Sequence, residues 1–189
     1  MVSHLGALAV RRPLTIALLV RPSSADKTVV MTDRVNATDD EAVRLWVESY
    51  QGEVLGELYF AHVAKRLTDP AQRAKIDLLT CLERSTKELL EPVIRRLGVD
   101  AQPDQATVDA VGNVTDVDYL PMLESFVGAA AQYLPRYARL RSLVEPADAS
   151  IVDQLIAHEL AFELFARREL AGENETSTEP IHALSHVTC

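Results

Sequence analysis

The sequence of 189 residues predicts an all-α protein, arranged as an antiparallel bundle of four long helices with a long connection between the second and the third. Apolar residues recur at helical spacing over most of the chain, and the alternating pattern typical of strands is almost absent. Apolar residues make up 48% and charged residues 25%, which is the composition of an ordinary globular domain. This length and composition suit one domain with a substantial core.

The first two helices are predicted over residues 39–68 and from residue 70 to about residue 97. Asp69 has the position of an N-cap, Pro70 that of a first helical residue, and Gln72 follows three residues after the cap. Gly98 is a typical C-terminal stop, and Pro92 should kink the second helix near its end. The apolar stripe of the first helix contains Trp46, Tyr50, Phe60, Val63, Ala64 and Leu67.

Residues 99–116 form the longest connection, which has room for one short helix over residues 104–111. The third long helix is predicted over residues 118–144, with a bend near Pro135. Ser150 and Asp153 match a capping box, so the fourth helix should begin there and end at Leu170, before Gly172.

Both ends of the chain lack this sustained periodicity. Residues 1–38 are predicted to be a disordered leader, with Met31 as an alternative natural start, and residues 172–189 a disordered tail. An alternative for the leader is an export signal, because "RRPLTIALLVRP" places two arginines before a short apolar run. That run is too short to cross a bilayer, so we expect a soluble, cytoplasmic protein that does not enter the membrane.

Charge and residue types exclude several classes of protein. The formal net charge of −9 argues against a nucleic-acid partner, which requires a basic surface. Cys81 and Cys189 are the only cysteines, which suggests no disulfide framework and a reducing compartment. The chain also has no glycine-rich phosphate loop and no nucleophile elbow.

Acidic and imidazole side chains fall on or beside the predicted apolar stripes of all four helices. A carboxylate in a low-dielectric interior is unfavourable unless a partner or a cation compensates its charge. One or two divalent cations would compensate several such groups, and ligands that are mostly oxygen with one imidazole suit iron or manganese better than structural zinc. The candidate ligands are Glu53, Glu57, Glu83, Glu124, His158 and Glu159.

Each candidate also has a purely structural interpretation. Glu53 and Glu57 would lie at a solvated edge if the first helix were rotated, and the glycines beside them, Gly52 and Gly56, would then reflect close helix packing alone. His158 would be a hydrogen-bonded core residue. Glu83 would be held by one of three polar neighbours, Tyr50, Tyr59 or Arg84. A second histidine pair, His182 and His186, lies in the predicted disordered tail and is a weak metal signal.

Two segments, "LERSTKELLEP" and "LIAHELAFELFARRELAG", resemble the second and the final helix of rubrerythrin-like proteins in the ferritin-like superfamily. The resemblance extends over residues 40–171. Such bundles hold two iron ions with one Glu from each of two helices and a Glu-x-x-His pair from each of the other two. It implies as ligands Glu53 or Glu57 on the first helix, Glu83 on the second, Glu124 on the third and His158 on the fourth.

Both Glu-x-x-His pairs of this chain are incomplete, because Thr86 stands where the first histidine is expected and Leu155 where the second glutamate is expected. A mononuclear centre, an altered centre with two metal ions and a bundle without metal therefore stay open. The resemblance implies a metal-dependent oxidoreductase with dioxygen or another small molecule as substrate. The alternative is a non-catalytic helical interaction or oligomerisation protein, for instance a homodimer.

Overall fold

The computed structural model describes residues 34–115 and 117–189, and every regular element within them is a helix. The predicted all-α class is therefore confirmed. Of the predicted leader, residues 1–33 lie outside the described part, whereas residues 34–38 already belong to the first helix. In chain order the helices are α1 (Arg34–Ala64), α2 (Pro70–Leu97), α3 (Gln105–Gly112), α4 (Tyr119–Phe126), α5 (Ala130–Leu143), α6 (Ala149–Leu170) and α7 (Glu179–His182).

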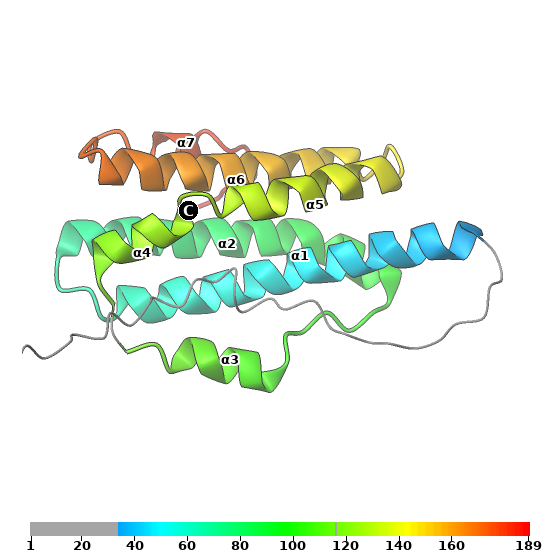
Figure 1. Ribbon diagram of the computed structural model, residues 1–189, viewed down its shortest axis with the longest axis horizontal. Coiled ribbons are helices and arrows are strands. Elements are labelled where there is room, and N and C mark those ends of the chain that lie inside the picture. Colours follow the sequence, from blue (N-terminus) through cyan, green and yellow to red (C-terminus); the bar gives the residue numbers. More distant parts are fainter. Residues whose placement is uncertain (1–33, 116) are drawn as a thin grey trace, which may run out of the picture.

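The long helices pack side by side in two pairs (Figure 1). α1 lies along α2, and α6 lies along α5 and α4. Contacts of α1 with α5 and of α2 with α6 join the two pairs. α3 packs on the outer side of α1, and α7 packs on α6. Within residues 34–115 and 117–189, no helix is both long enough and apolar enough to pass through a membrane.

The start and the end of α2 agree with the sequence prediction. The Asp69 side chain accepts hydrogen bonds from the backbone N–H groups of Ala71 and Gln72, at 2.7 and 3.1 Å. Gly98 ends the helix with φ of 65°, a left-handed conformation that glycine adopts without a steric penalty. The predicted short helix in the connection also forms: it is α3, and Asp104 caps it through the backbone N–H of Thr107.

The predicted third helix is wrong in detail, because it is divided into α4 and α5. The chain breaks at Gly128, whose φ of +88° is incompatible with a continuing helix, and Pro135 lies within α5 instead of marking the break. The fourth helix begins at Ala149, so Ser150 is inside α6 and forms no capping box. Of the residues at this break, Ala129 lines a cavity that is described below.

The core consists of two clusters of buried apolar side chains along the helices. One cluster includes three phenylalanines, Phe60, Phe126 and Phe162, whose ring centroids lie 5.0–5.8 Å apart. The other includes Trp46 and Leu155. Polar side chains interrupt the apolar packing where the two clusters approach each other.

The prediction of a disordered tail over residues 172–189 is wrong. This segment contains α7, and Ile181 is completely buried. Leu184 and Val187 pack against the same cluster as the phenylalanines. These three apolar residues recur at intervals of three, but so short a run does not predict a helix.

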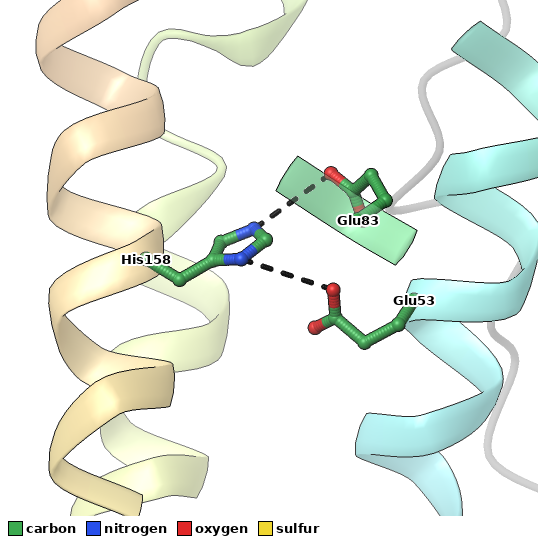
Figure 2. Close-up of side chains that lie close together, drawn as sticks. All are labelled: Glu53, Glu83 and His158. Atoms are coloured by element: carbon green, nitrogen blue, oxygen red, sulfur yellow. Dashed lines mark ion pairs between the residues drawn. The ribbon is translucent and has the colours of Figure 1, made fainter. Parts of the chain in front are cut away.

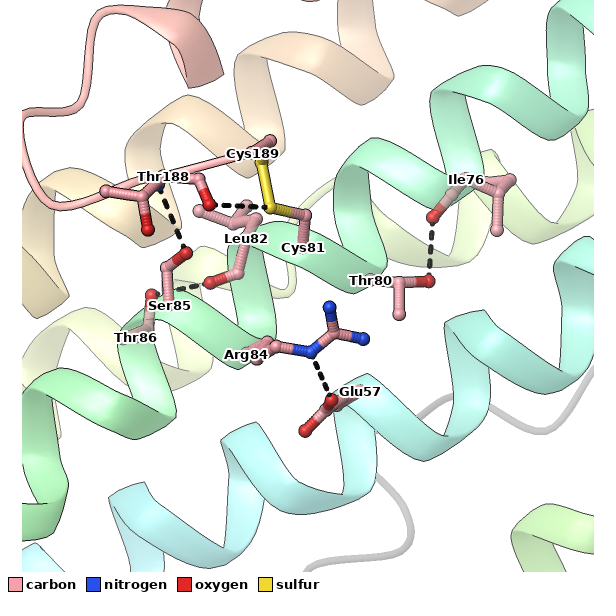
Figure 3. The surroundings of a disulfide bond; sticks show 10 residues. All are labelled: Glu57, Ile76, Thr80, Cys81, Leu82, Arg84, Ser85, Thr86, Thr188 and Cys189. Carbon is pink, nitrogen blue, oxygen red and sulfur yellow. Dashed lines mark hydrogen bonds and ion pairs between the residues drawn. A yellow bond between two sulfur atoms is a disulfide. The ribbon is translucent and has the colours of Figure 1, made fainter.

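The cysteine count suggests no disulfide framework, yet the structure contains one disulfide. Cys81 of α2 and Cys189 form a disulfide, with Cα atoms 5.9 Å apart and a sequence separation of 108 (Figure 3). Disulfides are rare in reducing compartments, so this bond does not support the prediction of a reducing compartment. A cross-link over so long a loop stabilises a fold by roughly 4–5 kcal/mol in the chain-entropy account.

Candidate metal centre

Three side chains from three helices meet in the interior: Glu53 of α1, Glu83 of α2 and His158 of α6 (Figure 2). Each offers one ligand atom, and these atoms lie within 4.8 Å of one another. His158 Nδ1 is 3.8 Å from Glu53 Oε2, and His158 Nε2 is 3.7 Å from Glu83 Oε1. These distances are too long for hydrogen bonds. Opposite ligands of one transition-metal ion lie about 4 Å apart, so the distance between His158 Nε2 and Glu83 Oε1 is close to that between two such ligands.

The three side chains are buried, with 3–7% of each residue exposed. Glu53 Oε2 has no hydrogen-bond partner among the described residues. An unpartnered carboxylate oxygen in a dry interior costs several kcal/mol if the group is ionised. The cluster therefore needs either protons or a cation.

Gly56 of α1 makes room for the Glu83 carboxylate. A Cβ atom at this position would lie 2.3 Å from Glu83 Oε2 and 2.6 Å from its Cδ, which is well inside van der Waals contact. A Cβ atom on Gly52, one turn earlier, would meet no described atom within 4 Å. Of the two glycines, Gly56 thus has a direct role in the geometry of the cluster.

Burial shifts the ionisation of the whole group toward uncharged forms. It raises the pKa of Glu53 well above its usual range, and the neighbouring carboxylates of Glu83 and Glu159 add to the effect. Burial likewise raises the pKa of Glu83 and of Glu159 to about 8 each. Burial lowers the pKa of His158 to about 3. Near neutral pH the carboxyl groups therefore keep their protons and the imidazole is neutral. A bound cation would replace the carboxyl protons.

A hydrogen-bond network determines which nitrogen of His158 is free. The hydroxyl of Thr86, completely buried, donates to Leu82 O at 3.0 Å, and its single proton is then used. Thr86 Oγ1 also lies 2.9 Å from His158 Nδ1 and 3.0 Å from His186 Nε2. Both rings must therefore donate to this oxygen. His158 carries its proton on Nδ1, so the lone pair on Nε2 faces Glu83.

A cavity of about 60 Å³ opens beside the cluster. Glu53, Glu83, His158 and Glu159 form its polar side. Glu159 is 8% exposed, and the hydroxyl of Tyr137 partly offsets the rise of its pKa. Aromatic and small residues form the remaining wall, and the space suits a few water molecules or a very small substrate. These other lining residues are Gly52, Gly56, Phe60, Phe126, Ala129, Tyr133, Tyr137 and Phe162.

Two of the predicted ligands lie elsewhere. Glu57 pairs with Arg84 at 2.7 Å (Figure 3) and also with Lys87, both of α2, at the solvent-facing edge between the helices. Glu124 is exposed on α4, where Met122 and Leu123 are buried instead. Four residues advance a helix by 40° beyond a full turn, which is enough to take Glu57 off the inward face. The break at Gly128 leaves α4 with a rotation of its own, so the predicted stripe through Glu124 was wrong.

The sequence reasoning missed four residues beside the cluster. Tyr133 and Tyr137 of α5 line the cavity, whereas the sequence suggests only Tyr50 and Tyr59 as tyrosines beside the candidate ligands. Their spacing of four residues on one face was a usable signal. In the sequence Thr86 only stands where a histidine is expected, and His186 is only a weak metal signal in the predicted disordered tail.

The chain matches no protein-family model, and comparisons with curated proteins and with solved structures likewise find no match. The assignment of function therefore depends on the site itself. The buried group of Glu53, Glu83 and His158 could hold a metal ion.

Proposed function

We propose that this chain is a ferritin-like bundle that binds one or two iron or manganese ions between α1, α2 and α6. The observation that carries the proposal is the convergence of two buried carboxylates and one imidazole within 4.8 Å, each from a different helix. Without a cation these acids must keep their protons, because each is unfavourable there when ionised.

The residues fit a metal ion in three respects. Glu53 Oε2 is a buried acceptor to which no described residue donates a hydrogen bond. Gly56 leaves space that the Glu83 carboxylate fills. The Thr86 contact leaves Nε2 of His158 unprotonated, as metal binding requires. Ligands of this kind suit iron or manganese.

Charge balance is compatible with either one ion or two. With Glu53 and Glu83 ionised and Glu159 protonated, one divalent cation leaves the centre neutral. If Glu159 also loses its proton, the charge of the ligand set is −3, and one divalent cation leaves −1 whereas two leave +1. Burial favours a centre whose net charge is near zero.

When bound, iron or manganese would supply redox chemistry toward dioxygen or peroxide. The chain itself contributes the surroundings of that chemistry. The phenylalanines of the cavity give it an apolar wall, and the small volume admits only a small reactant. Glu159, whose pKa burial raises to about 8, lines the same cavity and can hold a proton there, with the hydroxyl of Tyr137 beside it.

Metal content tests the proposal directly. Protein produced with added iron or manganese and analysed by elemental mass spectrometry should hold about one or two equivalents. The double variant Glu83→Ala, His158→Ala should hold none, whereas Glu124→Ala, altered on the exposed face of α4, should match the wild type. Wild-type protein without metal, and with a melting temperature that a chelator leaves unchanged, would refute the proposal.

The alternative is a non-catalytic interaction or oligomerisation protein. The observation in its favour is a pair of exposed leucines one turn apart on α6, Leu160 (53% exposed) and Leu164 (41% exposed). Light scattering after size exclusion would support this alternative if a dimer dissociates in a Leu160→Glu variant and metal is absent. A protein that contains metal and also forms a dimer through these leucines would have both functions.

A further inference from the structure

The end of the chain, residues 183–189, lies along α2 close to the metal centre. Its last residue is joined to Cys81 by the disulfide, and the backbone N–H of Thr188 donates to Ser85 Oγ at 3.3 Å (Figure 3). Leu184 and Val187 pack against the adjacent core cluster. The segment is thus attached by one covalent bond, by apolar contact and by few hydrogen bonds.

This segment brings His186 to Thr86. His186 Nε2 lies 3.0 Å from Thr86 Oγ1, and the same oxygen lies 2.9 Å from His158 Nδ1. The threonine hydroxyl donates its only proton in a hydrogen bond to Leu82 O and accepts hydrogen bonds from both rings. All of its hydrogen-bonding capacity is then used. A threonine held in this way has one rotamer and one proton position. His158, which donates to it, is held in turn.

His186 has one hydrogen bond of its own, from Nε2 to Thr86 Oγ1. Its Nδ1 is buried without a partner among the described residues, which is unfavourable for a polar atom. Apart from the bond to Thr86, the position of the ring depends on the segment that carries it, which the disulfide joins to α2. His182, four residues earlier on α7, is exposed.

We propose that His186 is a positioning residue for His158, acting through Thr86, and that the Cys81–Cys189 disulfide holds it in that role. The inference rests on the proposed function, since the affinity it concerns is that for a metal ion at Nε2 of His158. Reduction by a dithiol supplies two electrons and two protons. The S–S bond breaks, each cysteine sulfur becomes a thiol, and the dithiol becomes a cyclic disulfide. Release of the segment then leaves Thr86 free to change its rotamer and its proton position.

Cobalt(II) is a suitable probe, because its absorption spectrum reports directly on its ligands. Titration of the metal-free full chain should give about tenfold weaker binding for His186→Leu than for the wild type, the lower end of the effect of outer ligand partners. His186→Gln places an amide N–H near the position of Nε2 and should restore binding to within about threefold. His182→Leu is the matched control in the same segment and should bind as the wild type does.

The double variant Cys81→Ser, Cys189→Ser removes the cross-link without leaving a thiol that could itself bind cobalt. It should lose about as much affinity as His186→Leu, and adding His186→Leu to it should have little further effect. Circular dichroism at the titration temperature checks that each variant is folded. If the folded double variant binds cobalt like the wild type, the disulfide does not hold His186 in its role and this part of the inference is wrong.

Nitrogen-15 NMR of the metal-free protein separates this inference from the proposed function. The His158 signals should show a proton on Nδ1 in the wild type and in His186→Gln, and a mixture of both neutral forms in His186→Leu. Wild-type protein with that pattern but without affinity for cobalt would refute the metal centre and keep the positioning role. Unchanged His158 signals and unchanged affinity in His186→Leu would refute the positioning role and keep the metal centre.

Discussion

Substitution of Glu159 by glutamine should make the metal-free protein more stable near neutral pH. Glutamine has almost the same shape and cannot ionise. Burial raises the pKa of Glu159 from 4.5 to about 8, so between these values the folded state binds a proton that the unfolded state has released. Stability therefore falls as pH rises through this interval.

The magnitude follows from the two pKa values. At about 1.4 kcal/mol per pH unit, this carboxyl group destabilises the fold by on the order of 4 kcal/mol at about pH 7.5 and by less than about 1 kcal/mol at pH 5. Glu159→Gln should remove this contribution. The variant should therefore gain several kcal/mol over the wild type near pH 7.5 and little near pH 5.

Urea unfolding of chelator-treated protein, followed by circular dichroism at both pH values, measures this difference. Glu124→Gln, on the exposed face of α4, is the matched control and should follow the wild type. Added manganese should reverse the order, since a cation compensates the carboxylates of the wild type. If the wild type and Glu159→Gln differ by the same amount at both pH values, Glu159 is not a buried, proton-holding group and the reasoning is wrong.

Three further changes test the geometry of the centre. Gly56→Ala should weaken metal binding at least tenfold, because its Cβ would collide with the Glu83 carboxylate. Gly52→Ala is the control: it should bind metal normally and gain about 0.5–1 kcal/mol of stability from helix propensity. Equal manganese affinity of the two variants in calorimetric titration would contradict this prediction. Thr86→Val should lower manganese affinity by about 10- to 100-fold, and Thr86→Ser should restore most of it; equal affinity of both would exclude the hydroxyl from the site. Glu57→Gln should leave metal content unchanged in elemental analysis and alter stability by no more than about 1 kcal/mol, and loss of metal from this variant would return Glu57 to the ligand set.

Local features of the sequence determined the helices and their clear ends. The cap at Asp69, the stop at Gly98 and the apolar periodicity each act over a few residues, so they can be identified without knowledge of the fold. Periodicity also predicted that Glu53, Glu83 and His158 point inward, and the structure brings these three together.

Only the tertiary structure decided how each helix is rotated against its neighbours. Periodicity gives the angles between residues of one helix, but not which of two acids 40° apart faces the interior. Contact with α2 resolved this in favour of Glu53, and Arg84 and Lys87 attract Glu57 to the edge. The rotation of α4 after the break at Gly128 placed Glu124 in solvent in the same way.

The end of the chain shows the same limit over a longer distance. The partners of Cys189 and His186 lie about 100 residues earlier in the sequence, and no local pattern records such a pairing. Helix caps and apolar stripes are short-range effects and were readable from the sequence. The disulfide, the contact of His186 with Thr86 and the cavity beside His158 exist only because the packing of distant segments brings their atoms together.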